Sequence, residues 1–223
     1  MNIVPPPRQV TSPPLVLASA SPRRRELLAR IGLVPAVCEA AAIDETPGRG
    51  ELPRDLAKRL ALAKGTAVAE RHSGAFVLAA DTVVARGRRI LPKPEEENVA
   101  RDCLALLSGG WHRVHTGVTV IDAGGQAQSR LVETRVRVKR LSAAEIDAYI
   151  AGGEWRGKAG GYAIQGSAGA FIPEIKGSYS NVVGLPLYET YTLLSGLGFP
   201  ALAHGFPAPA PAMNAPPTLS ESS

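Results

Sequence analysis

Short apolar strand patterns and helical patterns alternate along most of this 223-residue chain, and this alternation limits the folds open to it. Residues 75–80 form an uninterrupted apolar run, which is typical of a strand buried on both faces. Residues 53–70 repeat leucine and alanine at helical spacing. The strand patterns at 114–121 and 131–138 are separated only by a turn, so they are expected to be antiparallel. The alternation therefore predicts an α/β fold with a mixed sheet flanked by helices.

The other expected elements complete one folded unit over residues 14–199. Further strands are expected at 15–18, 83–85 and 90–91, and further helices at 22–31, 94–107, 142–150 and 186–197. Residues 1–13 and 200–223 are rich in proline and small residues, so we expect a disordered lead and a Pro/Ala-rich disordered tail.

Composition excludes some classes of function. Aromatic residues make up only 5% of the chain, which leaves no stacking platform for single-stranded nucleic acid despite the net charge of +5. Cys38 and Cys103 have no metal-ligand spacing and are expected to be reduced, buried thiols. No apolar stretch is long enough to span a membrane, and no signal-peptide pattern is present. We therefore expect a cytoplasmic protein.

The segment SASPRR at 19–24 places arginines where helix electrostatics disfavours them. Ser21 is predicted to cap a helix and Pro22 to be its first residue, so the arginines at 23–25 fall in the first turn. Each exposed cation there costs roughly 0.3–1 kcal/mol against the helix dipole. A bound anion would reverse that sign, so the segment predicts a phosphate site, with solvated arginines as the alternative.

Three charged side chains are candidates for chemistry on a phosphate. Asp81 follows the apolar run 75–80, and open α/β sheets place ligands beyond the carboxyl ends of their strands; a turn or capping role is equally compatible. Lys93 lies between two prolines, which suits contact with a phosphate as much as a solvated loop. Lys64 lies on a mostly apolar helix, and its spacing favours a head group in solvent over one that reaches a cleft.

Glu45 and the glycine-rich segment 157–166 are weaker candidates. Mg²⁺ takes oxygen ligands, often one or two carboxylates with substrate phosphates, so Glu45 and Asp81 can share such an ion; an ordinary polar turn is the simpler alternative. Gln165, within the glycine-rich segment, offers donors and an acceptor that suit the edge of a planar base. The segment lacks both glycine-rich nucleotide-binding patterns, so by itself it is more typical of a loop.

Seven short motifs follow one another in order: SASPRR at 19–24, DETP at 44–47, ADT at 80–82, KP at 93–94, SG at 108–109, HTGV at 115–118 and VGLPL at 183–187. Through this ordered set the chain resembles the Maf family of house-cleaning nucleoside triphosphate pyrophosphatases, over about residues 14–199. The resemblance implies an elongated, twisted mixed sheet with a cleft between two lobes, as in inosine triphosphate pyrophosphatases.

The branch of the family that acts on dTTP and UTP is the one this chain resembles, because IQG occurs at 164–166 together with SPRR and ADT. The resemblance implies hydrolysis of dTTP and UTP to the monophosphate and pyrophosphate, with CTP and modified pyrimidine nucleotides as further candidates. It implies that Asp81 is catalytic. In the mechanism that we expect, Asp81 acts alone or with Mg²⁺ or Mn²⁺, and Glu45 is the second metal ligand. The substrate-binding residues would be Ser19, Arg23, Arg24, Lys64, Thr82, Lys93 and Gln165, of which Arg23, Thr82 and Gln165 set base preference.

Two other functions remain open at the level of sequence. One is a nucleotide- or nucleic-acid-binding regulator of cell division or septum formation. A pocket carboxylate at Asp81 speaks against it, because anion binding gains nothing from one. The other is a phosphatase that removes only the γ-phosphate. We expect a small-molecule nucleotide as the partner, no membrane or stable nucleic-acid partner, and, from the resemblance, a homodimer.

Overall fold

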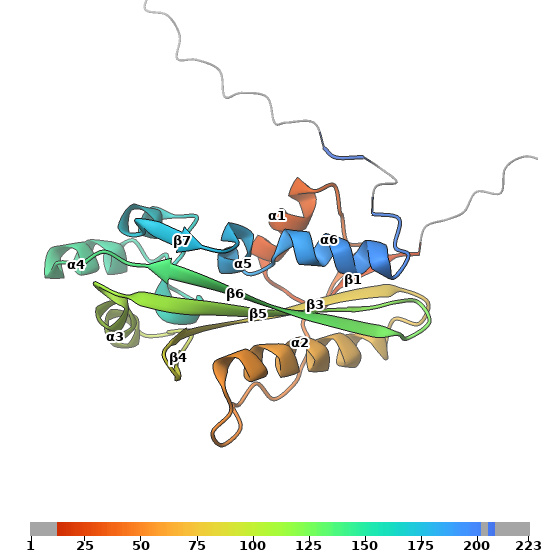
Figure 1. The fold of residues 1–223 in the computed structure, drawn as a ribbon, viewed down its shortest axis with the longest axis horizontal. Coiled ribbons are helices and arrows are strands. Elements are labelled where there is room, and N and C mark those ends of the chain that lie inside the picture. The colour runs from red at the N-terminus through yellow and green to blue at the C-terminus, as the bar shows by residue number, and fades with distance from the viewer. Residues whose placement is uncertain (1–12, 202–204, 208–223) are drawn as a thin grey trace, which may run out of the picture.

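One seven-stranded sheet forms the centre of the computed structural model, which describes residues 13–201 and 205–207 (Figure 1). The expected lead at 1–13 lies outside the described residues except for residue 13, and most of the expected tail at 200–223 also lies outside them. The strands are β1 (Leu15–Leu17), β2 (Val37–Cys38), β3 (Phe76–Arg86), β4 (Arg89–Leu91), β5 (Trp111–Ile121), β6 (Ala127–Arg137) and β7 (Glu174–Lys176).

The helices lie between these strands in the order that the alternation predicts. They are α1 (Pro22–Arg30), α2 (Pro53–Ala69), α3 (Glu97–Leu107), α4 (Ala143–Ala151), α5 (Tyr179–Val183) and α6 (Leu187–Gly196), with 3₁₀ turns at η1 (Ala159–Gly161) and η2 (Ser167–Phe171). In the part of the chain that the structure describes, no helix is both long and apolar enough to cross a membrane.

The sheet is mixed, as the sequence predicts. Its order is β2-β1-β3-β5-β6-β7, and β4 pairs with the same edge of β3 as β1, further along the strand. The β2, β1 and β3 strands are parallel, whereas β3, β5, β6 and β7 are successively antiparallel. The strands expected at 83–85 and 90–91 form the β3–β4 hairpin, in which Arg86 pairs with Arg89.

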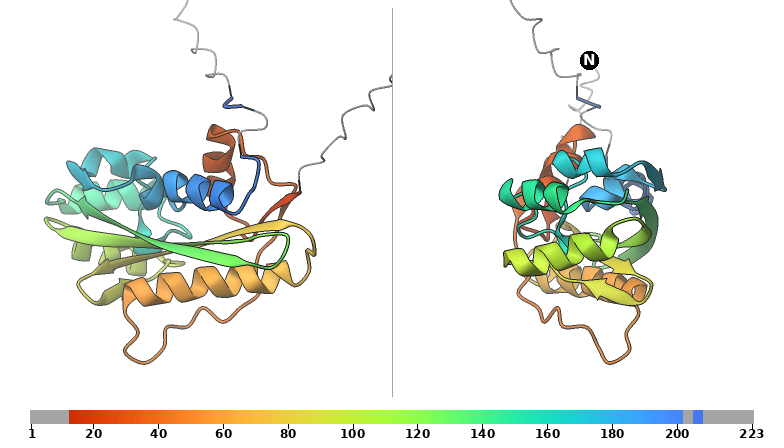
Figure 2. Two further views of the ribbon diagram at one scale, coloured as in Figure 1. Left: turned by 45° about the vertical axis from the view of Figure 1, so that its right-hand side comes forward. Right: turned by 90° about the vertical axis from the view of Figure 1, so that its left-hand side faces the viewer.

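Helices cover both faces of the long strands (Figures 1 and 2), and two large clusters of buried side chains lie beneath different helices. Helix α2 runs along one face, while α1 and α6 cover the opposite face beside β1. The cluster under α1 and α6 contains Leu28, Leu78 and Leu194. A second cluster, which contains Leu104, Tyr149 and Trp155, joins α3 and α4 to the glycine-rich segment. These two clusters are the cores of the two expected lobes.

Several elements differ from the sequence prediction. Strand β3 does not end at residue 80, because β5 pairs with it continuously from Val77 to Ala85. Helix α3 begins at Glu97 rather than at residue 94, since the chain is still extended at Glu96. Strands β2 and β7 and helix α5 are only two to five residues long, too short for a periodic pattern to appear. Cys38 is exposed rather than buried.

Helix α2 lies unusually close to β5 because Gly117 has no side chain. A Cβ atom at this position would lie 2.3 Å from the carbonyl oxygen of Ala57, so only glycine fits beneath the helix backbone. Gly65, on the helix side of the same interface, has more room: its Cβ would lie 3.4 Å from the nearest side-chain carbons. The spacing between α2 and the sheet is therefore set by Gly117.

These two glycines make a matched test of that spacing. Gly117→Ala forces α2 away from β5, and we expect it to lower the free energy of unfolding by about 1–3 kcal/mol, the usual cost of overpacking. Gly65→Ala fits without a clash and improves helix propensity by about 0.5–1 kcal/mol, so it should leave stability unchanged or raised. Urea unfolding measures both. Equal stability of the two variants would contradict the close packing.

Candidate active site

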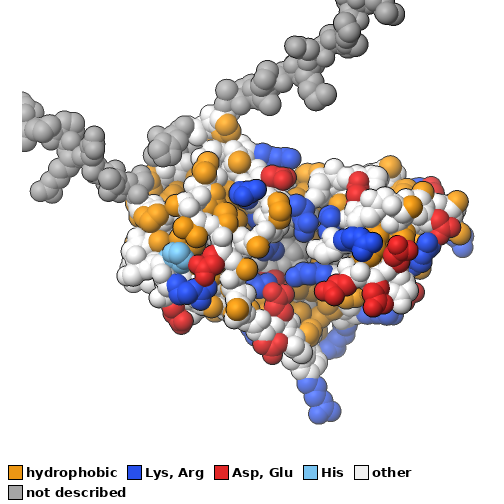
Figure 3. All heavy atoms as spheres, turned by 180° about the vertical axis from the view of Figure 1, so that it is seen from behind, with side chains coloured by type: hydrophobic (Ala, Val, Ile, Leu, Met, Phe, Trp, Pro, Cys, Tyr) orange, Lys and Arg blue, Asp and Glu red, His pale blue; other side chains and the backbone are white. Residues whose placement is uncertain are grey.

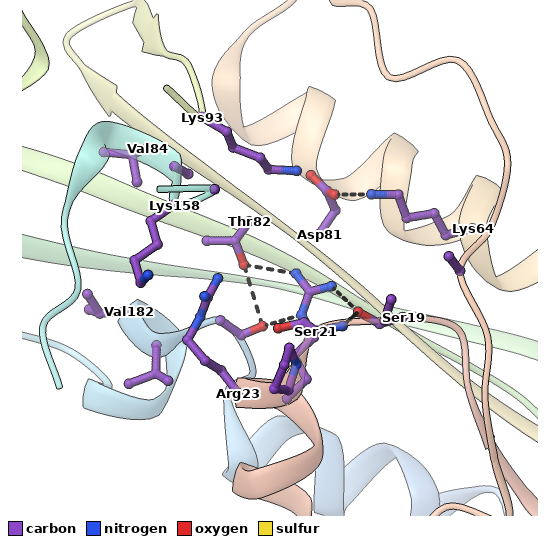
Figure 4. A pocket seen from close by; sticks show the side chains of 18 of the residues that line it. Ser19, Ser21, Arg23, Lys64, Asp81, Thr82, Val84, Lys93, Lys158 and Val182 are labelled. Atoms are coloured by element: carbon purple, nitrogen blue, oxygen red, sulfur yellow. Dashed lines mark hydrogen bonds and ion pairs between the residues drawn. The ribbon is translucent and has the colours of Figure 1, made fainter. Parts of the chain in front are cut away.

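The nine residues predicted for catalysis, substrate binding or metal binding all line one cavity of about 330 Å³. Figure 3 shows a hollow on this face, with Lys and Arg side chains beside Asp and Glu side chains at its rim, and Figure 4 shows the interior. The nine residues come from α1 and the segment before it, the loop before α2, α2 itself, β3, the segment after β4, and the glycine-rich segment: Ser19, Arg23, Arg24, Glu45, Lys64, Asp81, Thr82, Lys93 and Gln165.

The cavity lies where one edge of β3 is left without a neighbouring strand. Strand β1 ends opposite Leu78, and β4 ends, at Leu91, opposite Val84. Residues 79–83 therefore pair on one side only, with β5. Because neighbouring residues of a strand point to opposite faces, Asp81 and Thr82 project to different faces but both reach the cavity through this gap.

Asp81 consequently lies in the middle of an 11-residue strand, not beyond the end of one as the sequence suggested. Its side chain points to the face covered by α2 and is almost fully buried. A buried carboxylate needs a hydrogen-bonded or charged partner, because an isolated ion is very costly to remove from water. That partner comes from α2.

Lys64 joins the two carboxylates of the site. Its Nζ lies 2.5 Å from Oδ1 of Asp81 and 2.6 Å from Oε1 of Glu45. Lys93 approaches Glu45 from the other side, with 3.3 Å between Nζ and Oε2. The expectation that the Lys64 head group lies in solvent is wrong, because residues 56, 60, 64 and 68 form the stripe of α2 that faces the sheet. Desolvation raises the pKa of Glu45, but its contacts with the two lysines outweigh this and leave it below the usual value.

Arg24 holds three parts of the cavity wall together. Its guanidinium donates to the carbonyl oxygen of Gly184 at 2.9 Å, to Oγ of Ser19 at 3.0 Å and to Oγ1 of Thr82 at 3.4 Å. Thr82 is also bonded to Thr116 on β5. Helix α1, strand β3 and the turn before α6 are therefore fixed relative to one another by one planar group.

The start of α1 differs in detail from the prediction. Ser21 occupies the N-cap position, but its side chain makes no capping hydrogen bond. Instead the Ser21 amide donates to Oγ of Ser19 at 3.2 Å. Arg25 is exposed and does not line the cavity, whereas Arg23 is half-buried and does. Only the first two of the three arginines can therefore contact a ligand in this cavity.

The glycine-rich segment is docked against the residues around Lys93. The amide of Gly160 donates to the carbonyl oxygen of Pro92 at 2.9 Å, which links the segment that carries Gln165 to the segment that carries Lys93. Tyr162, in the same glycine-rich segment, is hydrogen-bonded to His112 of β5, with 2.7 Å between its hydroxyl and Nε2 of the histidine. Burial lowers the pKa of His112 to about 4, so the ring is neutral at neutral pH. The segments that carry Lys93 and Gln165 are thus fixed relative to each other.

Lys158 lines the same cavity, although the sequence gave it no role. Burial lowers its pKa, and the charge of Arg23 lowers it further. Among the described residues neither of these two cations makes a salt bridge. The signal available in the sequence is a lysine inside a glycine-rich segment, but whether such a lysine faces a cavity depends on the fold.

The carboxylates of Glu45 and Asp81 fit a hard divalent cation. Their oxygens flank a single cationic group, the Lys64 ammonium, and Mg²⁺ typically takes one or two carboxylates together with substrate phosphates. Within the described ranges, no group of three or more His, Cys, Asp or Glu side chains is arranged to hold a metal ion. A metal here would therefore depend on the substrate for its remaining ligands.

A buried carboxylate ringed by cations, in a cavity at an open strand edge, defines an α/β protein that handles phosphorylated small molecules. Residues 14–197 match the family model described as "Maf-like protein", and the chain belongs to this family.

Relatives named "dTTP/UTP pyrophosphatase" match most of the chain. The protein of Rhodospirillum rubrum is 60% identical over 85% of this chain and 90% of its own length. That of Caulobacter vibrioides is 63% identical over 84% of this chain and 97% of its own. That of Mesorhizobium japonicum is 60% identical over 83% of this chain and 92% of its own.

The role of Arg24 can be tested with a neighbouring arginine as control. Arg24→Lys keeps the charge but cannot reproduce the planar fork that reaches Gly184, Ser19 and Thr82. We expect the free energy of unfolding to fall by about 1.5–3 kcal/mol, the range for a lost hydrogen bond to a charged group. Arg25→Lys should have no measurable effect. A thermal or urea melt in which both variants match the parent would contradict the bracing role.

Proposed function

We propose that this protein is a nucleoside triphosphate pyrophosphatase that hydrolyses dTTP and UTP to the nucleoside monophosphate and pyrophosphate. The observation that carries the proposal is the buried Asp81 beside Lys64 in a cavity with four further basic side chains, from Arg23, Arg24, Lys93 and Lys158. A site of this kind offers a proton acceptor and several groups that offset phosphate charge. The names of the relatives, 60% identical or close to it, support the same substrates.

Asp81 is the catalytic residue in this proposal. Its carboxylate orients a water molecule against the α-phosphorus and accepts a proton from it as the new P–O bond forms. The bond from the α-phosphorus to the bridging oxygen breaks, and pyrophosphate leaves with the bonding electrons. Lys64 keeps the carboxylate in place through the 2.5 Å contact.

The cationic side chains stabilise the charge that develops on the leaving group. Lys64 and Lys93 are the basic groups at the Asp81 and Glu45 wall of the cavity, and Arg24 contributes those N–H groups that do not brace the protein. Preorganised donors of this kind lower a barrier most in a site partly screened from water. Gln165 is exposed in the cavity and suits the edge of the pyrimidine. Thr82 supports Arg24, and Arg23 lines the cavity beside Lys158 (Figure 4).

Replacing the carboxylate tests the chemistry directly. Asp81→Asn retains the size of the side chain but cannot accept a proton, so kcat for dTTP should fall by at least about a hundredfold, in the range for lost general-base catalysis. Binding of dTTP should persist in calorimetry. The wild-type product should be pyrophosphate and dTMP by ion-exchange chromatography. Full turnover by the variant would refute the role of Asp81, and orthophosphate with dTDP would refute the reaction.

Glu45 and Asp81 are the residues that would hold Mg²⁺ or Mn²⁺. Bound with the substrate, such an ion would polarise phosphoryl oxygens as a Lewis acid. The protein residues supply only two carboxylates to this site, so the affinity for the metal should depend on the nucleotide.

A titration with Mg²⁺ tests this assignment. We expect activity to disappear with a chelator and to return with Mg²⁺ or Mn²⁺. Glu45→Gln should raise the Mg²⁺ concentration for half-maximal rate by about tenfold, since one of the two ligand charges is lost. The matched control is Asp44→Asn, which removes the adjacent charge without touching Lys64. An unchanged Mg²⁺ requirement in Glu45→Gln would remove Glu45 from the metal site.

We place this reaction in the cytoplasm, where nucleoside triphosphates are made and used, and we interpret it as the removal of nucleotides before their incorporation. A regulator that merely binds nucleotides gains nothing from the buried Asp81, and no other described feature favours that alternative. The homodimer stays a prediction.

A further inference from the structure

The cavity has two chemically different walls. On one, the ammonium groups of Lys64 and Lys93 are engaged by the carboxylates of Asp81 and Glu45. On the other, Lys158 and Arg23 lie side by side (Figure 4), and neither forms a salt bridge among the described residues. Among the described residues, the Lys158 ammonium donates one long hydrogen bond, 3.4 Å to the carbonyl oxygen of Arg156.

The surroundings of Lys158 suit a base better than a phosphate. Val84, Val182 and Val183 line the cavity, and Figure 4 shows Val84 and Val182 on the same side as Lys158. Apolar side chains of this kind stabilise the faces of a planar ring and contribute nothing to a phosphate. Gln165, seven residues further along the same glycine-rich segment, also lines the cavity.

The length of a nucleotide leads to the same placement. Once the α-phosphorus lies at Asp81, the reacting phosphates occupy the wall that holds Lys64 and Lys93. The base is at the opposite end of the molecule and extends toward the wall that carries Lys158. This step depends on the proposed function, because it uses Asp81 to locate the α-phosphorus.

We propose that Lys158 donates a hydrogen bond to the carbonyl oxygen at position 4 of the pyrimidine, and that this contact selects uracil and thymine nucleotides over cytosine nucleotides. A lysine ammonium is a donor only, and so is the guanidinium of Arg23 beside it. Thymine and uracil carry an acceptor oxygen at position 4, whereas cytosine carries an amino group, itself a donor. Cytosine would therefore leave two donors facing each other, and a site that loses a buried hydrogen bond rejects the wrong ligand strongly.

The steady-state test compares UTP with CTP in three variants. Lys158→Gln offers an acceptor as well as donors, so kcat/KM for UTP should fall about tenfold or more while that for CTP stays level or rises. Lys158→Arg remains donor-only and should keep the preference of the parent. Lys58→Gln removes one exposed lysine of α2, outside the cavity, and serves as the charge-matched control.

A binding measurement separates base recognition from phosphate recognition. UMP and CMP share one phosphate and sugar, so calorimetry with these two products reports on the base alone. Lys158→Gln should weaken UMP binding and leave CMP binding unchanged. An equal loss for both, or equal falls in kcat/KM for UTP and CTP, would assign Lys158 to the phosphates and overturn the proposal. Parental binding and kinetics in Lys158→Gln would overturn the proposal as well.

The two proposals fail in different ways. If the wild-type protein releases no pyrophosphate from any pyrimidine triphosphate, the proposed reaction is wrong, whatever Lys158 does. If it releases pyrophosphate from UTP and Lys158→Gln retains the parental ratio of UTP to CTP, only the selectivity assigned to Lys158 is wrong.

Discussion

The site depends on the unpaired stretch in the edge of β3. Because β1 pairs with β3 only as far as Leu78 and β4 pairs with it only from Val84 onward, the β3 backbone between these residues borders a cavity instead of another strand. The segments that carry the arginines and Lys93 follow directly from the ends of those two short strands. Antiparallel pairing with β5 on the other side keeps this stretch of β3 in a continuous strand. The topology therefore concentrates residues from distant parts of the chain around Asp81 without any long functional loop.

Charge pairing then decides how each wall behaves. Asp81 can be buried because α2 packs close enough to the sheet for Lys64 to form a salt bridge with it. This close packing is possible because residue 117 is glycine and has no side chain. Removing one partner of a buried ion pair is strongly destabilising, of the order of 3–5 kcal/mol when solvent is excluded. The stability of the fold and the chemistry of the site thus rest on the same contact. On the opposite wall, Lys158 and Arg23 form no salt bridge among the described residues, so their donors are available to a ligand.

Much of this could be predicted from the sequence, for identifiable reasons. The alternation of patterns predicted the mixed α/β sheet, and all nine candidate residues line one cavity. Periodicity did not predict features that depend on tertiary contacts. Strand β3 continues past Asp81 because it pairs with β5, and the Lys64 head group faces inward because it forms a salt bridge with Asp81. Ser21 has the position of a cap but not its hydrogen bond, since Ser19 takes the amide. Lys158 could not be singled out, because facing a cavity is a property of the folded segment.

The central claim is that water attacks the α-phosphorus beside Asp81. Hydrolysis of dTTP in water enriched in heavy oxygen, followed by mass spectrometry of both products, tests it most directly. We expect one heavy oxygen in dTMP and none in pyrophosphate. Heavy oxygen in the pyrophosphate would mean attack at the β-phosphorus and would contradict the placement of the substrate against Asp81.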